Sequence, residues 1–466
     1  MLPRAAQQIN YCATSPTSRG VLTWAFLHAG SRLTRLGSLA QSLLLALSSQ
    51  IMIPARFMQR NARGITTLAY SWGVGTDGEL GHASFQKEAT LMGDAYVQIE
   101  PRRIIRSKRF KTFAVGTQYT LALDQQGVLY HWGVSHTKQF KSNEPKAVGI
   151  DRKFTKIAVG SNHAAAVSED GEVFTWGRNQ GDNWMGISFM GGGGYLGHGD
   201  SQSVHTPKRV EFLSRYGAKA ADVVCGGRHT VIRTVDGELL SCGVGEYGRL
   251  GTGSTVDCLE PAPLETLVDE DIVQIAAGSS HTLALSKNGK LFVWGRNDYG
   301  QLGFEDSYMD MYSLEDIPRL LEAQAFQDKK IVSIIAARGR SGAITEDGQF
   351  FTWGYKSSHM PTLLSPRLVG GLRVVKAAFG GDVMSNSCTA LVTEDGSLWT
   401  YGDAGSHMIG RPLSTGQSGL GRIPEPSKVP VFQGKRVVDV YMGSGQHAIA
   451  TVEAEVGSTE DSSSDH

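Results

Sequence analysis

The sequence has 466 residues, and its 45 basic side chains balance its 45 acidic ones, so the formal net charge is zero. A balanced charge gives no general attraction to nucleic acid. The five cysteines, Cys12, Cys225, Cys242, Cys258 and Cys388, show neither metal-ligand spacing nor a disulfide framework. This excludes a disulfide-stapled secreted domain, and we expect small buried thiols in a reducing compartment.

The first 76 residues contain no acid, since the first one is Asp77. They are rich in serine, leucine and alanine, lack lysine and contain seven arginines: Arg4, Arg19, Arg32, Arg35, Arg56, Arg60 and Arg63. An arginine- and serine-rich segment without acids is typical of a mitochondrial or chloroplast transit peptide. We predict a mitochondrial transit peptide over residues 1–66, and a matrix or inner-membrane-associated protein. Chloroplast, nucleus and cytosol are the alternative locations.

Other interpretations of this leader remain open. Residues 39–53 are apolar, but the stretch contains polar side chains and is too short to cross a bilayer, so we expect no membrane span. Met52 or Met58 is an alternative start. Without the seven leader arginines, 38 basic residues stand against 45 acidic ones, which leaves a body with a net charge of −7.

From Leu68 onward one pattern recurs. It is an apolar run, a Gly followed by a polar residue or His, a second apolar run, an acidic or polar residue with Gly, and an aromatic-Gly pair. Residues 272–303 form the clearest copy. The copies align on the residues before seven glycines, about 55 residues apart on average: Trp72, Trp132, Trp176, Cys242, Trp294, Trp353 and Tyr401.

Short apolar or alternating runs within each copy, such as 156–159 and 164–167, predict strands. Tight hairpins are predicted at Asp170-Gly171, Asp236-Gly237, Asn288-Gly289, Asp347-Gly348 and Asp395-Gly396. Short antiparallel sheets repeated around an axis form a β-propeller, with the tryptophans filling the space between blades. Residues 437–452 supply the first half of a copy and residues 68–73 the second half. We predict an all-β, seven-bladed β-propeller over residues 67–452, closed by pairing its N-terminal and C-terminal strands.

The repeat residues carry a family resemblance. The run Gly278-Ser-Ser-His281, with Trp294-Gly295 and the ending Gly300-Gln-Leu-Gly303, resembles a repeat of the regulator of chromosome condensation (RCC) family. The Gly-His pattern also ends at His163, His229 and His447, whereas Tyr119 and the stretch 338–341 depart from it. The resemblance covers roughly residues 68–452 and implies a seven-bladed propeller like that of the organellar members.

The four histidines, His163, His229, His281 and His447, occupy one slot in different blades. Metal ligands must converge on one ion, so we expect no metal site here and interpret the rings as partners of neighbouring backbone. Gly73–Gly78 and Gly243–Gly248 match G-x-G-x-x-G but precede turns instead of helices. We therefore expect no nucleotide cofactor, no small-molecule substrate and no catalytic constellation.

Candidate binding residues lie where the repeat is interrupted. Residues 181–194 leave the third blade and display apolar side chains among glycines: Trp184, Met185, Ile187, Phe189 and Met190. An acidic loop carries Glu305, Asp306, Asp310, Glu315 and Asp316, with a short helix predicted at 320–326. One dense basic run, between 101 and 111, carries Arg102, Arg103, Arg106, Lys108, Arg109 and Lys111. A loop folded onto its own blade is the alternative for residues 181–194, and a solvated surface is the alternative for both charged segments. Residues 405–433 are predicted to be loop, and residues 453–466 a disordered acidic tail.

The resemblance implies a binding module, not an enzyme with its own catalytic groups. The best-known member of the family is the nuclear exchange factor of the small GTPase Ran, which uses one face and a projecting wedge. We therefore expect a mitochondrial platform that regulates a small or organellar GTPase by guanine-nucleotide exchange, with 181–194 in the wedge position. The alternatives are a scaffold in mitochondrial ribosome assembly or RNA processing, supported by the basic run, and a nuclear or cytosolic Ran exchange factor.

Overall fold

The computed structural model describes residues 66–82, 88–90, 93–105, 108–180, 192–304, 313–355, 358–381, 387–403, 407–412, 422–443 and 445–454. Apart from Thr66, Glu453 and Ala454, the predicted leader and tail lie outside these ranges and stay predictions. A compact unit extends from Thr67 to Ala454.

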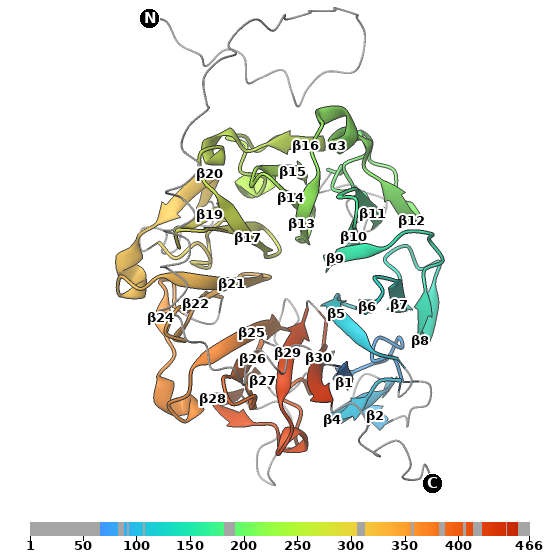
Figure 1. The fold of residues 1–466 in the computed structure, drawn as a ribbon, viewed down its shortest axis with the longest axis vertical. Helices are drawn as coiled ribbons and strands as arrows, with labels where there is room; N and C mark the ends of the chain where they lie inside the picture. Colours follow the sequence, from blue (N-terminus) through green and yellow to red (C-terminus); the bar gives the residue numbers. More distant parts are fainter. Residues whose placement is uncertain are drawn as a thin grey trace, which may run out of the picture. The chain divides into compact units, whose positions relative to one another are not determined.

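Seven four-stranded antiparallel sheets surround a common centre in this unit, which confirms the predicted all-β propeller (Figure 1). Blade 1 joins β29 (Val437–Met442), β30 (His447–Ala454), β1 (Thr66–Val74) and β4 (Val97–Arg103). Blade 2 contains β5 (Phe110–Val115), β6 (Tyr119–Asp124), β7 (Leu129–Val134) and β8 (Lys141–Ala147). Blade 3 contains β9 (Phe154–Val159), β10 (His163–Ser168), β11 (Val173–Gly177) and β12 (Val204–Arg209). Blade 4 contains β13 (Ala220–Cys225), β14 (His229–Thr234), β15 (Leu239–Gly243) and β16 (Cys258–Pro263).

The remaining blades follow the same order. Blade 5 contains β17 (Ile272–Ala277), β18 (His281–Ser286), β19 (Leu291–Arg296) and β20 (Leu314–Leu321). Blade 6 contains β21 (Ile331–Ala337), β22 (Arg340–Thr345), β23 (Phe350–Gly354) and β24 (Thr362–Leu363). Blade 7 contains β25 (Val374–Gly380), β26 (Cys388–Thr393), β27 (Leu398–Asp403) and β28 (Arg422–Lys428). A ribbon of β2 (Glu88–Thr90) and β3 (Gly93–Ala95) stands apart from the blades. The helical elements described are α3 (Glu211–Tyr216), η4 (Glu246–Gly248), η5 (Glu265–Leu267), η7 (Ala323–Phe326), η8 (Pro366–Val369) and η10 (Pro430–Phe432).

The ring closes through strands from the two ends of the repeat region, as predicted. In blade 1, β30 lies between β29 and β1, so late and early segments share one sheet. The backbone N–H of Val74 also donates to the carbonyl of Gln446 at 2.8 Å. Across the next junction, Ile449 of blade 1 packs with Phe113 and Trp132 of blade 2. Both β30 and β1 therefore have a paired strand on each side, and neither leaves an unpaired sheet edge.

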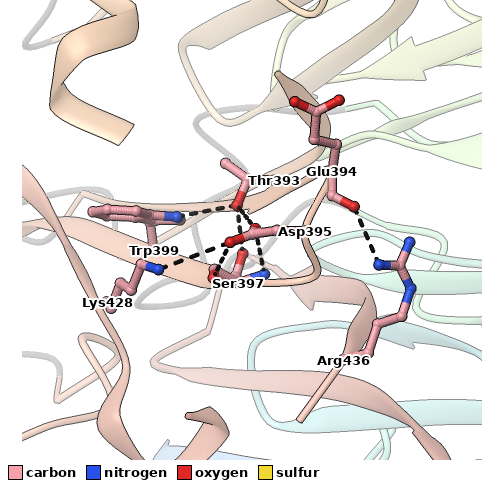
Figure 2. Close-up of polar contacts among 7 residues, drawn as sticks. All are labelled: Thr393, Glu394, Asp395, Ser397, Trp399, Lys428 and Arg436. Carbon is pink, nitrogen blue, oxygen red and sulfur yellow. Dashed lines mark hydrogen bonds and ion pairs between the residues drawn. The ribbon is translucent and has the colours of Figure 1, made fainter. Parts of the chain in front are cut away.

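The Asp-Gly hairpins sit where the sequence places them. Gly171 has a φ of +82°, and a Cβ added there would lie 2.8 Å from the Cβ of Lys219, so glycine is needed both for conformation and for space. Figure 2 shows the hairpin of blade 7. Its Asp395 carboxylate accepts hydrogen bonds from Thr393 and Ser397, and the guanidinium of Arg436 donates to the Glu394 carbonyl at 3.2 Å. Each such turn thus also contacts the following blade.

The antiparallel order divides the connections between two faces. The first-to-second and third-to-fourth strand connections of every blade lie on one face, which we call the crossover face. The second-to-third hairpins and the blade-to-blade connections lie on the opposite face, which we call the hairpin face. Inner strands therefore run from the hairpin face to the crossover face.

Two segments differ from the sequence predictions. Residues 314–321 and 422–428 are the fourth strands β20 and β28, whereas the acidic loop and the loop 405–433 were expected there. The predicted helix at 320–326 is a short 3₁₀ turn, η7, that follows the end of β20.

Candidate protein-binding surface

Buried tryptophans bond across the blade junctions. Trp72, Trp132, Trp294 and Trp353 are fully buried, and each indole N–H donates to a backbone oxygen of the preceding blade. The bonded pairs are Trp72 with Met408 (2.8 Å), Trp132 with Glu79 (2.8 Å), Trp294 with Arg249 (3.1 Å) and Trp353 with Gln301 (3.0 Å). The indole of Trp176 donates instead to the hydroxyl of Tyr119, at 3.5 Å. These side chains fill the junctions and fix the distance between blades.

The four repeat histidines reach in the other direction, into the following blade. Their Nε2 atoms lie beside hydroxyl oxygens, in the pairs His163–Thr230 (2.7 Å), His229–Thr282 (2.9 Å), His281–Ser341 (2.9 Å) and His447–Thr120 (2.9 Å). Each hydroxyl donates its own hydrogen to a backbone oxygen, as Ser341 does to Gln301 at 2.7 Å. The histidine must therefore donate from Nε2, which fixes the tautomer. The partners are side-chain hydroxyls, whereas the sequence led us to expect backbone groups.

The junctions that lack a histidine follow the same logic. Arg340 occupies the slot in blade 6, where its guanidinium donates to the Thr389 hydroxyl at 3.1 Å and lies 4.3 Å from the Phe379 ring centre. Tyr119 fills the slot in blade 2 and Cys388 fills it in blade 7, as their pairing with Gly133 and Gly402 shows. The residue facing them in the next blade is alanine, Ala164 and Ala448 respectively. A hydroxyl is thus present at the five junctions that supply a nitrogen donor and absent at the other two.

Burial keeps these imidazoles neutral. It lowers the pKa of His163 and His447 to about 3 and that of His281 to about 4, and it lowers the pKa of His229 well below its usual value. Within the described ranges no group of three or more His, Cys, Asp or Glu side chains is placed to hold a metal ion. The four repeat imidazoles thus join neighbouring blades, and their Nε2 protons are used in these structural contacts.

The base of the third-blade loop is firmly held. Gln180 pairs with Gly193, and the Tyr195 hydroxyl donates to the Gln180 carbonyl at 3.0 Å. Gly194 packs on blade 4, since a Cβ there would lie 2.7 Å from the Cα of Leu259. The candidate side chains Trp184, Met185, Ile187, Phe189 and Met190 fall between these anchors and lie outside the described residues. The segment connects β11 to β12, so its anchors stand on the crossover face.

The acidic candidates do not form one loop. Glu305, Asp306 and Asp310 lie outside the described residues, whereas Glu315 and Asp316 belong to β20. Glu315 pairs with Arg319 at 2.6 Å, and the backbone of Asp316 accepts a hydrogen bond from Gly253 of blade 4. The part of this segment before β20 connects the third and fourth strands of blade 5, which again is the crossover face.

The basic run extends over two blades in the described structure. Arg102 and Arg103 end β4, the outermost strand of blade 1, whereas Lys111 lies in β5, the innermost strand of blade 2. The Lys108 ammonium donates to the Tyr130 hydroxyl at 2.9 Å. Arg109 precedes β5, and Arg106 lies outside the described residues. The run follows the blade-to-blade connection of the hairpin face from the outer strand of blade 1 to the inner strand of blade 2, and the RNA-scaffold alternative stays a prediction.

Two further expectations concern cysteines and membranes. Cys225, Cys242, Cys258 and Cys388 are buried thiols, and burial raises the pKa of Cys242 and Cys388 to about 12. Across the part of the chain that the structure describes, no helix is long and apolar enough to cross a bilayer.

Comparison with known proteins settles the family. A family model described as the RCC1-like domain matches residues 66–384, well over half of the chain. The chain belongs to the RCC1-like domain family. The resemblance seen in the repeat residues is thereby confirmed, and this RCC1-like propeller can be compared with individual relatives.

The curated relatives share part of their length with this RCC1-like propeller. It is 32% identical over 287 residues to "RCC1 domain-containing protein RUG3, mitochondrial" of Arabidopsis thaliana, which covers 61% of this chain and 49% of that protein. It is 32% identical over 285 residues to the ultraviolet-B receptor UVR8 of Arabidopsis thaliana, covering 61% and 60%. It is 29% identical over 312 residues to the human E3 ubiquitin-protein ligase HERC2, covering 65% and 5%. The chain therefore spans less than two thirds of each of these relatives.

Solved structures agree on the fold. Human WBSCR16 superposes with a TM-score of 0.68 at 22% identity, over 84% of this chain and 100% of that chain. Prp20p from Saccharomyces cerevisiae, whose structure was reported with its binding properties to Gsp1p and histones, superposes with a TM-score of 0.66 at 20% identity, over 84% and 92%. At these identities the likeness establishes the propeller alone.

Proposed function

We propose that this RCC1-like propeller is a mitochondrial binding platform that promotes guanine-nucleotide exchange on a GTPase through its crossover face. Exchange of this kind is catalysis by binding, because the platform stabilises the nucleotide-free state of its partner. It requires no acid, base or nucleophile on this chain. The exchange activity implied by the RCC resemblance is consistent with the four repeat histidines, which are all committed to blade junctions.

One observation carries the choice of face. Both apolar and acidic candidate segments, 181–194 and 305–316, interrupt a third-to-fourth strand connection, and their described anchors stand on the crossover face. Rigid sheets that hold irregular connections on one side suit recognition of another macromolecule. The mitochondrial location is supported by the acid-free, arginine-rich leader and by the name of the relative RUG3.

The direct test is release of fluorescent GDP from purified mitochondrial GTPases, measured with and without the full chain. We expect accelerated release with at least one of them, and a loss of acceleration when Trp184 and Phe189 are both changed to alanine. Val268→Ala is the matched control, because Val268 is an exposed apolar side chain, 59% accessible, on the blade-to-blade connection of the hairpin face. No acceleration with any of the GTPases would reject the exchange activity.

The location has its own test. A fluorescent protein fused after the last residue keeps the native leader, and we expect the fusion to enter mitochondria. Retention in the nucleus or cytosol would reject the mitochondrial part and favour a Ran exchange factor instead.

A further inference from the structure

The hairpin face carries a cavity at the mouth of the central channel. It has a volume of about 640 Å³ and is lined by the inner strands of blades 3 to 7, by residues of the second strands β14 and β22, and by the hairpin residues Glu346 and Gly348. In Figure 1 these inner strands, β9, β13, β17, β21 and β25, converge on the centre of the ring. A cavity of this size holds a few side chains and not a folded domain.

The lining is cationic although the body of the protein is acidic. Four cations, Lys156, Arg233, Arg373 and Lys376, face two carboxylates, Asp222 and Glu346. Lys376 has only a long contact to Asp439, at 3.6 Å, and the Nε of Arg233 is buried without a hydrogen-bond partner among the described residues. A surplus of positive charge here favours an anionic ligand.

The seven blades provide an internal comparison for Arg233. It is the fifth residue of the second strand of its blade, where the other blades carry Leu123, Val167, Leu285, Ile344, Val392 and Thr451. The fold is therefore satisfied by an aliphatic residue at this place, and the arginine is not needed for packing. Its guanidinium places a positive charge at the cavity where six other blades place none.

The same cavity also has an apolar arc. The second residue of every inner strand is skipped in the strand register, a β-bulge that turns this side chain toward the channel. In four consecutive blades the bulged residue is an exposed valine, 40–50% accessible: Val273, Val332, Val375 and Val438. Blades 2, 3 and 4 carry Lys111, Thr155 and Ala221 instead, so the repeat does not require valine. The first three valines line the cavity.

We propose that this channel mouth binds an acidic peptide segment of a partner protein, with an apolar side chain on the valine arc and its carboxylates on Arg233, Lys156 and Lys376. A purely ionic ligand would leave the valines exposed, and a purely apolar one would leave the surplus positive charge of the four cations over the two carboxylates uncompensated. The site is on the face opposite to the proposed exchange surface, so the peptide-binding proposal does not depend on the exchange proposal.

The repeat supplies substitutions that preserve the fold, because another blade already carries each new residue at the same place. Arg233→Leu copies Leu285, Lys376→Ser copies Ser333, and Val332→Thr copies Thr155. Lys146→Ser removes an exposed cation from the outer strand β8 and is the matched control. The probe is a fluorescein-labelled acidic peptide that contains one leucine and one phenylalanine, and binding is followed by fluorescence anisotropy with the full chain.

We expect Arg233→Leu combined with Lys376→Ser to weaken peptide binding at least about tenfold, and Val332→Thr to weaken it severalfold, with thermal midpoints unchanged. Lys146→Ser should bind like the wild type. Three results would overturn the proposal: no binding of the peptide to the wild type, equal binding by the cavity variants, or equally tight binding of polyaspartate or inorganic tripolyphosphate. The last result would identify a simple anion site in place of a peptide site.

Discussion

Glu79 provides a quantitative test of how the blade junctions are built. Its backbone oxygen accepts the Trp132 indole, and its side chain is 5% exposed. Burial raises the pKa of its carboxyl from 4.5 to about 7, and the backbone N–H of Asp77, which donates to Oε2 at 2.8 Å, opposes only part of this effect. In blade 5 the same place holds Gln301, whose Oε1 accepts the N–H of Tyr299 at 2.8 Å. An amide therefore makes the same turn without an ionisable group.

The perturbation is Glu79→Gln. The pKa of the Glu79 carboxyl is higher in the folded protein than in the unfolded chain, so the fold favours the protonated carboxyl. Ionisation of Glu79 therefore lowers the free energy of unfolding progressively from pH 4.5 to pH 7. A shift from 4.5 to about 7 corresponds to about 3 kcal/mol at pH 8, and close to none below pH 4.5. We expect the free energy of unfolding of the variant to exceed that of the wild type by up to that amount at pH 8, and by much less at pH 5.

The assay is urea unfolding of both proteins from pH 5 to pH 8. All other ionisable groups are shared by the wild type and the variant, so the difference in their free energies of unfolding isolates Glu79. The reciprocal change Gln301→Glu should lose stability mainly at high pH, because it buries a carboxylate beside Asp298, whose Oδ1 lies 3.3 Å from Gln301 Nε2. A stability difference for Glu79→Gln that is independent of pH would refute the reasoning.

Other predictions concern the same junctions. The buried histidines have lowered pKa values, so the free energy of unfolding should fall as the pH drops from 6.5 toward 4. His447→Gln should reduce the slope of the free energy of unfolding against pH by the equivalent of about one bound proton. Trp353→Phe should cost about 2–3 kcal/mol in denaturant unfolding, because it removes the indole hydrogen bond to Gln301 and leaves a void at a fully buried site; a loss well below about 1 kcal/mol would contradict the filling role of the indole. Cys388→His together with Ala448→Thr should install the missing junction bond, and a double-mutant cycle should give a favourable coupling of about 1 kcal/mol, whereas zero coupling would contradict the slot assignment.

The features that could be predicted from sequence are those fixed by local chemistry. Asp-Gly turns need positive φ at their glycine, and the aromatic-Gly pairs lie near the ends of the third strands. The number of blades and the closure of the ring could therefore be predicted from the sequence. The fourth strands were not, because β20 and β28 contain proline and many charged residues on exposed edges. Such strands are held by the neighbouring strand and by contacts with the preceding blade, and they carry little apolar pattern of their own.

The hydroxyl partners of the slot residues could not be predicted without knowing which blades are in contact. The residue after each slot, such as Thr230 after His229, is visible in the sequence, but its role depends on the preceding blade. The two alanines, Ala164 and Ala448, lie in the blades that follow the Tyr119 and Cys388 slots, so their match to these slots also depends on the order of the blades. The cationic channel mouth was inaccessible for a similar reason, since Arg233 and Lys376 lie in different blades and meet only when the ring closes.

The clasp between β30 and β1 has a mechanical consequence. These antiparallel neighbours end and begin on the hairpin face, so tension applied through the segments that precede β1 and follow β30 opens their ladder like a zipper, one bond at a time. The same ladder links residues separated by almost the whole repeat region, so it forms late and is the slowest contact to recover once lost. Unravelling under tension between these two segments would therefore begin in blade 1.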